Sequence, residues 1–210
     1  IWVMVLAFTK LGLIESHAVF TIYPLLVAAL SGPILGEKVG WRRWAAIAAG
    51  FCGVLIILQP GSGVLSPWAL VPLLASLMYA VYSLLTRYVA RRDAASVSFF
   101  WTGIICAVVS TPLGLWHWQE MTAPDWGLMA ALCAMGLAGH WAQIRAYALA
   151  EASSIQPFAY FQLVIVAMIG LVLFDEVLRP NVVVGAGIVV AAGLFTLWRQ
   201  RVREKQAARG

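Results

Sequence analysis

The sequence predicts an all-α integral membrane protein, a multi-span helical bundle, and three observations lead to this fold class. Hydrophobic residues make up 62% of the 210 positions and charged residues 11%, whereas a soluble domain carries about a quarter charged residues. Long charge-free runs, such as Trp44–Thr86, are continuously apolar rather than alternating, which favours helices over barrel strands. The third observation is an internal repeat that relates the start of the chain to its end.

The charge-free runs give the order of the elements, because a helix of about 20 residues crosses the hydrocarbon core of a bilayer. Trp44–Thr86 must cross twice, and Pro60-Gly61-Ser62-Gly63 marks the turn within it. Short connections leave no room for a soluble domain. We expect eight membrane segments and a frayed, solvated tail, at residues 1–14, 16–36, 42–59, 67–88, 96–116, 126–149, 154–174, 181–198 and 199–210.

The repeat pairs Glu37 with Glu176, which lies 139 positions later, and each glutamate ends a long apolar segment. The next span carries Gly53 in the first copy and Gly193 in the second, with a one-residue slip. Five expected spans separate the copies, and an odd number inserts the second copy in the opposite direction. An inverted repeat is typical of carriers that work by alternating access.

The basic residues predict the orientation. Eleven of the fourteen Lys and Arg residues fall on one side of the expected spans, and the exceptions are Lys10, Arg145 and Arg179. The positive-inside rule makes that side cytoplasmic, together with the carboxyl terminus, in a cell inner (plasma) membrane. The net charge of +5 therefore reflects topology in the lipid bilayer, and we expect no nucleic acid partner.

Several segments resemble the EamA family of the drug/metabolite transporter superfamily. They include Tyr23-Pro24-Leu25 through Leu35-Gly36-Glu37 and Pro157-Phe158-Ala159-Tyr160 through Phe174-Asp175-Glu176. The resemblance implies ten helices in two inverted five-helix repeats. Residues 1–59 would then hold the last three helices of the first repeat, and residues 67–198 all five of the second. Two amino-terminal helices would be absent from this chain, which starts at Ile1 inside an apolar stretch.

The resemblance also indicates a class of substrate. The run GHWAQIRAYALAEASSIQPFAYFQL is similar to the branch of the family that includes S-adenosylmethionine and riboflavin carriers. We expect a secondary transporter of a small organic metabolite, with amino-acid derivatives, nucleoside-like compounds and riboflavin-like compounds all open. The alternative is a non-transporting membrane scaffold or an inactive fragment of a carrier. Proton coupling, the direction of transport and a homodimer also stay open.

No enzymatic motif accompanies these features. The sequence has no HExxH cluster, no GxSxG motif, no pair of carboxylates within a span and no nucleotide-binding loop of the GxxxxGK[ST] type. We therefore expect no catalytic residue, no metal and no cofactor. The three cysteines lie singly within spans and are interpreted as small packing residues.

A carrier needs polar groups that face its cavity. Gly136, His140, Gln143, Tyr147 and Glu151 share one helical face, at spacings of 4, 3, 4 and 4. His140 could bind substrate, relay a proton or bond a neighbouring carbonyl, and Gln143 and Tyr147 could bind substrate or join helices. The substrate-binding candidates are His140, Gln143, Tyr147, Gln156, Tyr160, Tyr79, Trp141 and Arg145.

Other polar and small residues have a structural interpretation, two open roles or no assigned role. Glu37 and Glu176 could hold a coupling ion, but their place at span ends favours closing a turn or pairing with arginine. The rows Ala45/Ala49/Gly53 and Gly185/Val189/Gly193 predict close helix packing. Arg145 either extends to lipid phosphates or lines the inner vestibule, and His17 and Lys10 lie near the outer mouth without an assigned role.

Overall fold

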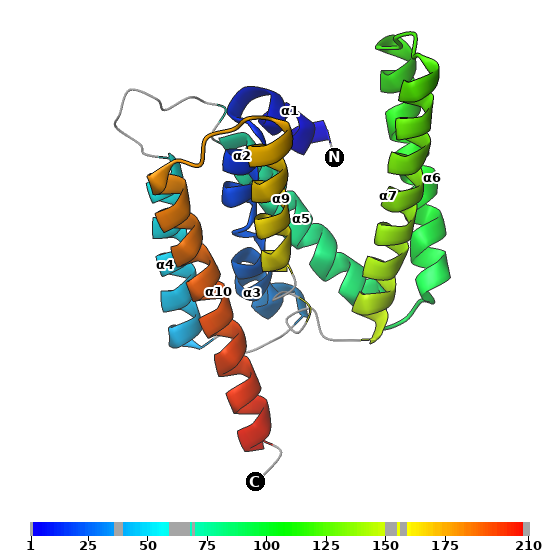
Figure 1. Cartoon of the computed structure of the whole chain (residues 1–210). Helices are drawn as coiled ribbons and strands as arrows, with labels where there is room; N and C mark the ends of the chain where they lie inside the picture. Colours follow the sequence, from blue (N-terminus) through cyan, green and yellow to red (C-terminus); the bar gives the residue numbers. More distant parts are fainter. Residues whose placement is uncertain are drawn as a thin grey trace. The chain divides into compact units, whose positions relative to one another are not determined.

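The computed structural model describes residues 2–35, 40–58, 68, 70–149, 155 and 159–207, and helices form this part of the chain (Figure 1). This confirms the predicted all-α class. The helices are α1 (Trp2–Leu11), α2 (Leu13–Phe20), α3 (Tyr23–Leu35), α4 (Trp41–Leu58), α5 (Leu70–Val89), α6 (Ala95–Trp116), α7 (Ala123–Leu149), α9 (Ala159–Leu173) and α10 (Pro180–Ala207). They form two compact units, Ile1–Leu85 with Ala152–Gly210, and Thr86–Glu151.

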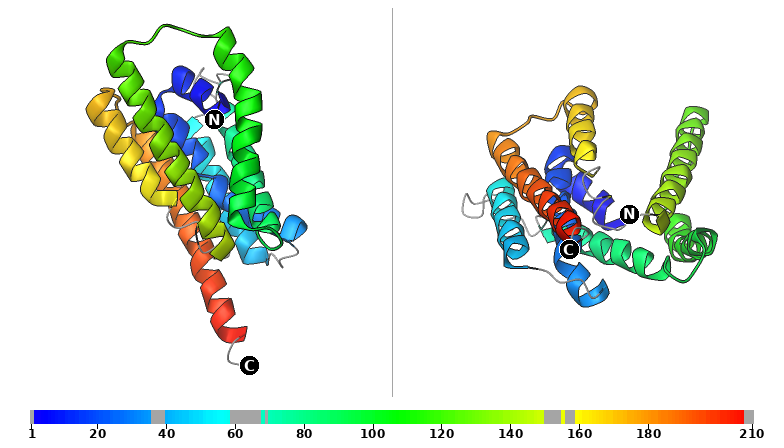
Figure 2. Two further views of the ribbon diagram at one scale, coloured as in Figure 1. Left: turned by 90° about the vertical axis from the view of Figure 1, so that its right-hand side faces the viewer. Right: turned by 90° about the horizontal axis from the view of Figure 1, so that it is seen from below.

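In the first unit, α4 and α10 pack side by side in opposite directions (Figures 1 and 2). Asn181, at the start of α10, donates a hydrogen bond of 2.9 Å to the carbonyl of Ile57, at the end of α4. A Cβ added to Gly53 would lie 2.7 Å from the Gly185 carbonyl oxygen, so the two backbones touch. The close packing predicted from the glycine rows is confirmed at this pair.

A second antiparallel pair joins α2 and α9. Glu176, just after α9, contacts the first residues of α2, and Ile14 fills the space beside Gly170 of α9. Adding 139 to Trp41, the first residue of α4, gives Pro180, the first residue of α10. The counterpart helices α4 and α10 thus run in opposite directions, as expected for an inverted repeat, whereas α9 corresponds by the same shift to α3 and packs against α2.

The core of this unit lies where four helices meet, α2, α3, α4 and α10. Apolar side chains from all four are almost fully buried there, and their removal from water is the main stabilising contribution within the unit. The cluster contains Ile14, Ala18, Val19, Ile22, Leu25, Ile47, Val54, Ile57, Val182, Ala186, Val189 and Ala192.

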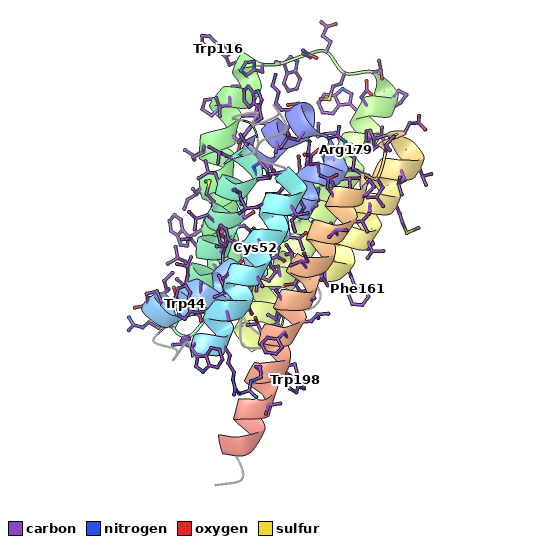
Figure 3. All side chains as sticks on the ribbon, turned by 90° about the vertical axis from the view of Figure 1, so that its left-hand side faces the viewer. Trp44, Cys52, Trp116, Phe161, Arg179 and Trp198 are labelled. Carbon is purple, nitrogen blue, oxygen red and sulfur yellow. The ribbon has the colours of Figure 1, made fainter. Side chains whose placement is uncertain are left out.

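Many large apolar side chains of the described helices are exposed on the surface. Four stretches are long and apolar enough to cross a membrane: Leu13–Ile34, Leu70–Val89, Ala95–Trp116 and Ala123–Leu149. Trp2–Leu11, Trp44–Leu58, Ala159–Leu173 and Pro180–Thr196 are shorter apolar helices. Figure 3 shows Trp44 and Trp198 toward one end of the α4–α10 pair and Arg179 at the other. Exposed tryptophans near helix ends are typical of the membrane interface, and the chain is a multi-pass membrane protein.

The basic tail differs from the expectation. Residues 199–207 continue α10 as a helix instead of fraying after the span. The physical reason is composition, because Arg, Glu, Lys, Gln and Ala are all strong helix formers.

The second unit contains a hairpin of α6 and α7, seen in two views in Figure 2. The start of α7 is capped locally, since the Asp125 carboxylate accepts bonds from the Thr122 hydroxyl at 2.6 Å and from its backbone N–H at 3.0 Å. This arrangement satisfies polar groups that the helix itself leaves unpaired.

Candidate functional site

The span Leu13–Ile34 is broken in its middle, at Thr21 and Ile22, where α2 ends and α3 begins. Pro24 has no N–H, so the Phe20 carbonyl lacks the donor that a continuous helix would supply. The Ser76 hydroxyl of α5 lies within hydrogen-bonding distance of that carbonyl, at 3.3 Å, and of the Pro72 carbonyl, at 2.6 Å. Irregular backbone at membrane depth requires such protein partners.

Aromatic rings gather at this break. Phe20 and Tyr23, which flank it, have ring centroids 5.4 and 4.7 Å from that of Tyr79 on α5. Phe8 of α1 stacks on His17 at 4.9 Å, with the rings 8° from parallel. We call this set the aromatic row, and it consists of Phe8, His17, Phe20, Tyr23, Tyr79 and Tyr82.

The aromatic row is partly exposed. Phe8, Phe20, Tyr79 and Tyr82 are half-buried, whereas His17 and Tyr23 are buried. Aromatic faces and edges stack on flat conjugated groups, and a tyrosine hydroxyl adds a hydrogen-bonding group to the same surface.

His17 and Gln162 place a polar pair beside the row. His17 Nδ1 lies 3.2 Å from the Leu13 carbonyl, which can only accept, so this nitrogen carries the hydrogen. In the neutral ring, Nε2 then accepts from the Gln162 amide nitrogen of α9, at 3.4 Å. Gln162 is exposed, and its amide offers both a donor and an acceptor. The pair joins the two helices and presents hydrogen-bonding groups next to stacking rings.

The predicted residues divide between the two units. Tyr79 and Tyr160 belong to the first unit, and Tyr79 is part of the aromatic row. Tyr160 is buried, and its hydroxyl has no hydrogen-bond partner among the described residues. That hydroxyl occupies the space where a side chain at Gly193 of α10 would begin, so Tyr160 packs α9 against α10. Gln156 lies outside the described residues, as do Glu37 and Glu151.

In the second unit, the predicted polar face of α7 is partly covered. Tyr147 is buried, His140 and Gln143 are half-buried, and Gly136 is exposed. The Tyr147 carbonyl accepts a hydrogen bond of 2.8 Å from the guanidinium of Arg87. The spacing argument therefore identified residues that share a face, with burial increasing toward the end of the helix.

Three more side chains of this unit form an aromatic and basic cluster. Phe99 of α6 meets His140 at 5.9 Å and Trp141 edge-to-face at 5.3 Å between ring centroids. The Arg145 guanidinium lies over the Trp141 ring at 5.9 Å from its centroid. This cation–π contact is an alternative to the two roles that the sequence suggested for Arg145.

The Glu176 side chain joins two segments of the first unit that lie far apart in the sequence. Its carboxylate accepts hydrogen bonds from the backbone N–H groups of Leu13, at 2.5 Å, and Ile14, at 2.8 Å. It thus caps the first turn of α2, where N–H groups have no intrahelical partner and a negative charge is favoured. This geometry supports the structural reading of Glu176 over the coupling-ion reading.

The sequence does not single out most of the aromatic row, nor Gln162. It gives no role to His17, and Tyr23 stands out there only within the segment that resembles the family. The signal was present in Pro24, because a proline inside a charge-free run interrupts a helix and marks the irregular backbone at which carriers bind substrate.

Together these features define a class of protein, a multi-pass helical membrane protein with an interrupted span and two antiparallel helix pairs. The chain belongs to the EamA-like transporter family, whose sequence profile matches residues 66–198, more than half of the chain.

Three relatives illustrate the family. The chain is 26% identical over 178 residues to the S-adenosylmethionine uptake transporter of Rickettsia prowazekii (strain Madrid E), covering 85% of this chain and 60% of that protein. It is 29% identical over 208 residues to the riboflavin transporter of Vibrio cholerae serotype O1, covering 98% and 70%. It is 32% identical over 177 residues to the riboflavin transporter of Rhizobium johnstonii, covering 83% and 58%. The chain thus spans 58% to 70% of their lengths. No solved structure matches the chain.

Proposed function

We propose that this protein is a secondary transporter that moves a small organic metabolite across the cytoplasmic membrane by alternating access. The observation that carries the proposal is the broken span α2–α3, with stacking rings and the His17–Gln162 pair at its interruption. Secondary carriers bind substrate near the bilayer midplane, where broken helices expose backbone and side-chain polar groups. The antiparallel pairing of α4 with α10 and of α2 with α9 supports the same mechanism.

The substrate we propose is a flat, partly aromatic metabolite. The aromatic row supplies stacking surfaces, and the Gln162 amide supplies a donor and an acceptor for a polar ring edge. Relatives named as transporters of riboflavin and S-adenosylmethionine make a flavin-like or adenine-containing compound the first choice. One relative is named an uptake transporter and another an exporter, so transport should be measured both into and out of the cell.

Orientation follows from the basic residues. We propose that the carboxyl terminus is cytoplasmic and that the α9–α10 connection, with Arg179, faces outward in the inner membrane. The candidates His140, Gln143, Tyr147, Gln156, Tyr160, Trp141 and Arg145 stay proposed substrate contacts, and the position of Tyr160 beside Gly193 gives it a packing contact as well.

The test compares metabolites inside and outside cells that express the complete reading frame, by mass spectrometry. A transported metabolite should redistribute with the intact protein and lose most of that redistribution with His17→Ala or Tyr79→Ala. Tyr88→Ala, an exposed tyrosine farther along α5, is the matched control and should behave as the intact protein. Equal redistribution by all variants would refute the site, and no redistribution of any metabolite would refute the carrier.

A further inference from the structure

The contact between the start of α2 and the α9–α10 connection is built from several elements at once. The Glu176 carboxylate bonds the N–H groups of Leu13 and Ile14, across 163 and 162 residues of chain. Its own backbone N–H donates to the Gly170 carbonyl at 3.0 Å, which holds the connection against the end of α9. The carboxylate is therefore fixed at both its backbone and its side chain.

The backbone has a positive φ on each side of this contact. Gly12, just before α2, has a φ of +83°, and Asp175, just before Glu176, has a φ of +50°. Both values lie in the left-handed region, which costs little at glycine and is tolerated by aspartate. A Cβ at Gly12 would stand 3.0 Å from the Glu176 carboxylate, so glycine also gives that group its room.

Apolar packing and a second ionic contact reinforce the same junction. Ile14 is buried, and one of its carbons would lie 2.5 Å from a Cβ added at Gly170. Within the first turn of α2, Glu15 pairs with Arg179 of the connection at 3.7 Å. Arg179 is largely exposed, so this pair contributes less than the part-buried cap.

The geometry points to a latch: Glu176 holds the outer end of α2 against α9, and its release frees the start of α2 from α9 on the side where His17 meets Gln162. The inference rests on the proposed transport function for its purpose. The same two helices carry His17 and Gln162, so separating them at Glu176 also parts the polar pair of the site. A cap made of hydrogen bonds to one carboxylate is local and can break without unfolding either helix.

The test measures opening directly by cysteine labelling, and it requires no substrate. Cys52, Cys106 and Cys133 are replaced by alanine, and a reporter cysteine is placed at Ile14, under the latch. A second protein carries its reporter at Val54, buried in the core beside α10. Each is labelled in membranes with N-ethylmaleimide, with and without Glu176→Gln, and Glu120→Gln in the exposed α6–α7 connection is the matched control.

Glu176→Gln should raise the labelling rate at position 14 by about tenfold or more, since hydrogen bonds to a charged group are the strong ones. The rate at position 54 should stay unchanged, and Glu120→Gln should change neither. An unchanged rate at position 14 would overturn the latch. Equal increases at positions 14 and 54 would also overturn it, because they would show that Glu176 only stabilises the fold. Either failure would leave the metabolite experiment to decide transport by itself.

Discussion

Tyr160, a candidate for substrate binding, packs against Gly193 of a second helix in the structure. The sequence predicts that Tyr160 shares a helix face with other polar residues. It does not predict which residue of another helix lies opposite that face. In the structure, the tyrosine hydroxyl occupies the space beside Gly193, and only a residue without a side chain leaves that space free. Spacing along one helix contains no information about the small residue on another.

This contact predicts the outcome of a double-mutant cycle. Gly193→Ala should lower the free energy of unfolding by about 1–3 kcal/mol, because the new methyl group collides with the Tyr160 hydroxyl. Tyr160→Phe alone should leave stability unchanged or raised, since it removes a buried hydroxyl without a partner in the described part of the chain. The measurement is unfolding in detergent for both single variants and the pair. Costs that simply add would contradict the contact, because the alanine should be better tolerated beside phenylalanine.

Among the elements, the sequence located the helices better than their interruptions. Hydropathy and charge located the described helices because lipid requires long apolar runs. The bounds differ in two places, since α2 begins inside the predicted segment 1–14 and α10 continues to Ala207, beyond the predicted end at 198. The predicted segment 16–36 hid the break between α2 and α3, since hydropathy averages across a proline. The aromatic row depends on that break and on contacts between distant helices, so composition could not reveal it.

The broken span predicts a variant that gains regular structure and loses function. Pro24→Ala restores an N–H that can bond the Phe20 carbonyl, and it should close the interruption into a continuous helix. Thermal stability should be equal or higher, whereas uptake should fall by about tenfold if the break shapes the site. Pro33→Ala, near the end of α3, is the matched control and should retain uptake. Full transport by Pro24→Ala would show that the interruption is unnecessary.

At the largest scale, helices far apart in the sequence meet as antiparallel pairs, α4 with α10 and α2 with α9. In the first of these pairs Gly53 lies against Gly185, and Asn181 bonds the Ile57 carbonyl. The inverted repeat that Glu37 and Glu176 predict stays a prediction, and Glu176 itself bonds the start of α2. The substrate could not be predicted at this scale, because fold sets the mechanism whereas a few side chains set the chemistry.

We propose that this protein is a carrier whose substrate lies against the aromatic row. The most direct test is counterflow in liposomes that contain the purified product of the complete reading frame, preloaded with unlabelled riboflavin or S-adenosylmethionine. For at least one of the two compounds, labelled compound should enter these liposomes faster than empty liposomes, and His17→Ala should remove most of this uptake. Entry equal to that of empty liposomes for both compounds, or full counterflow by His17→Ala, would contradict it.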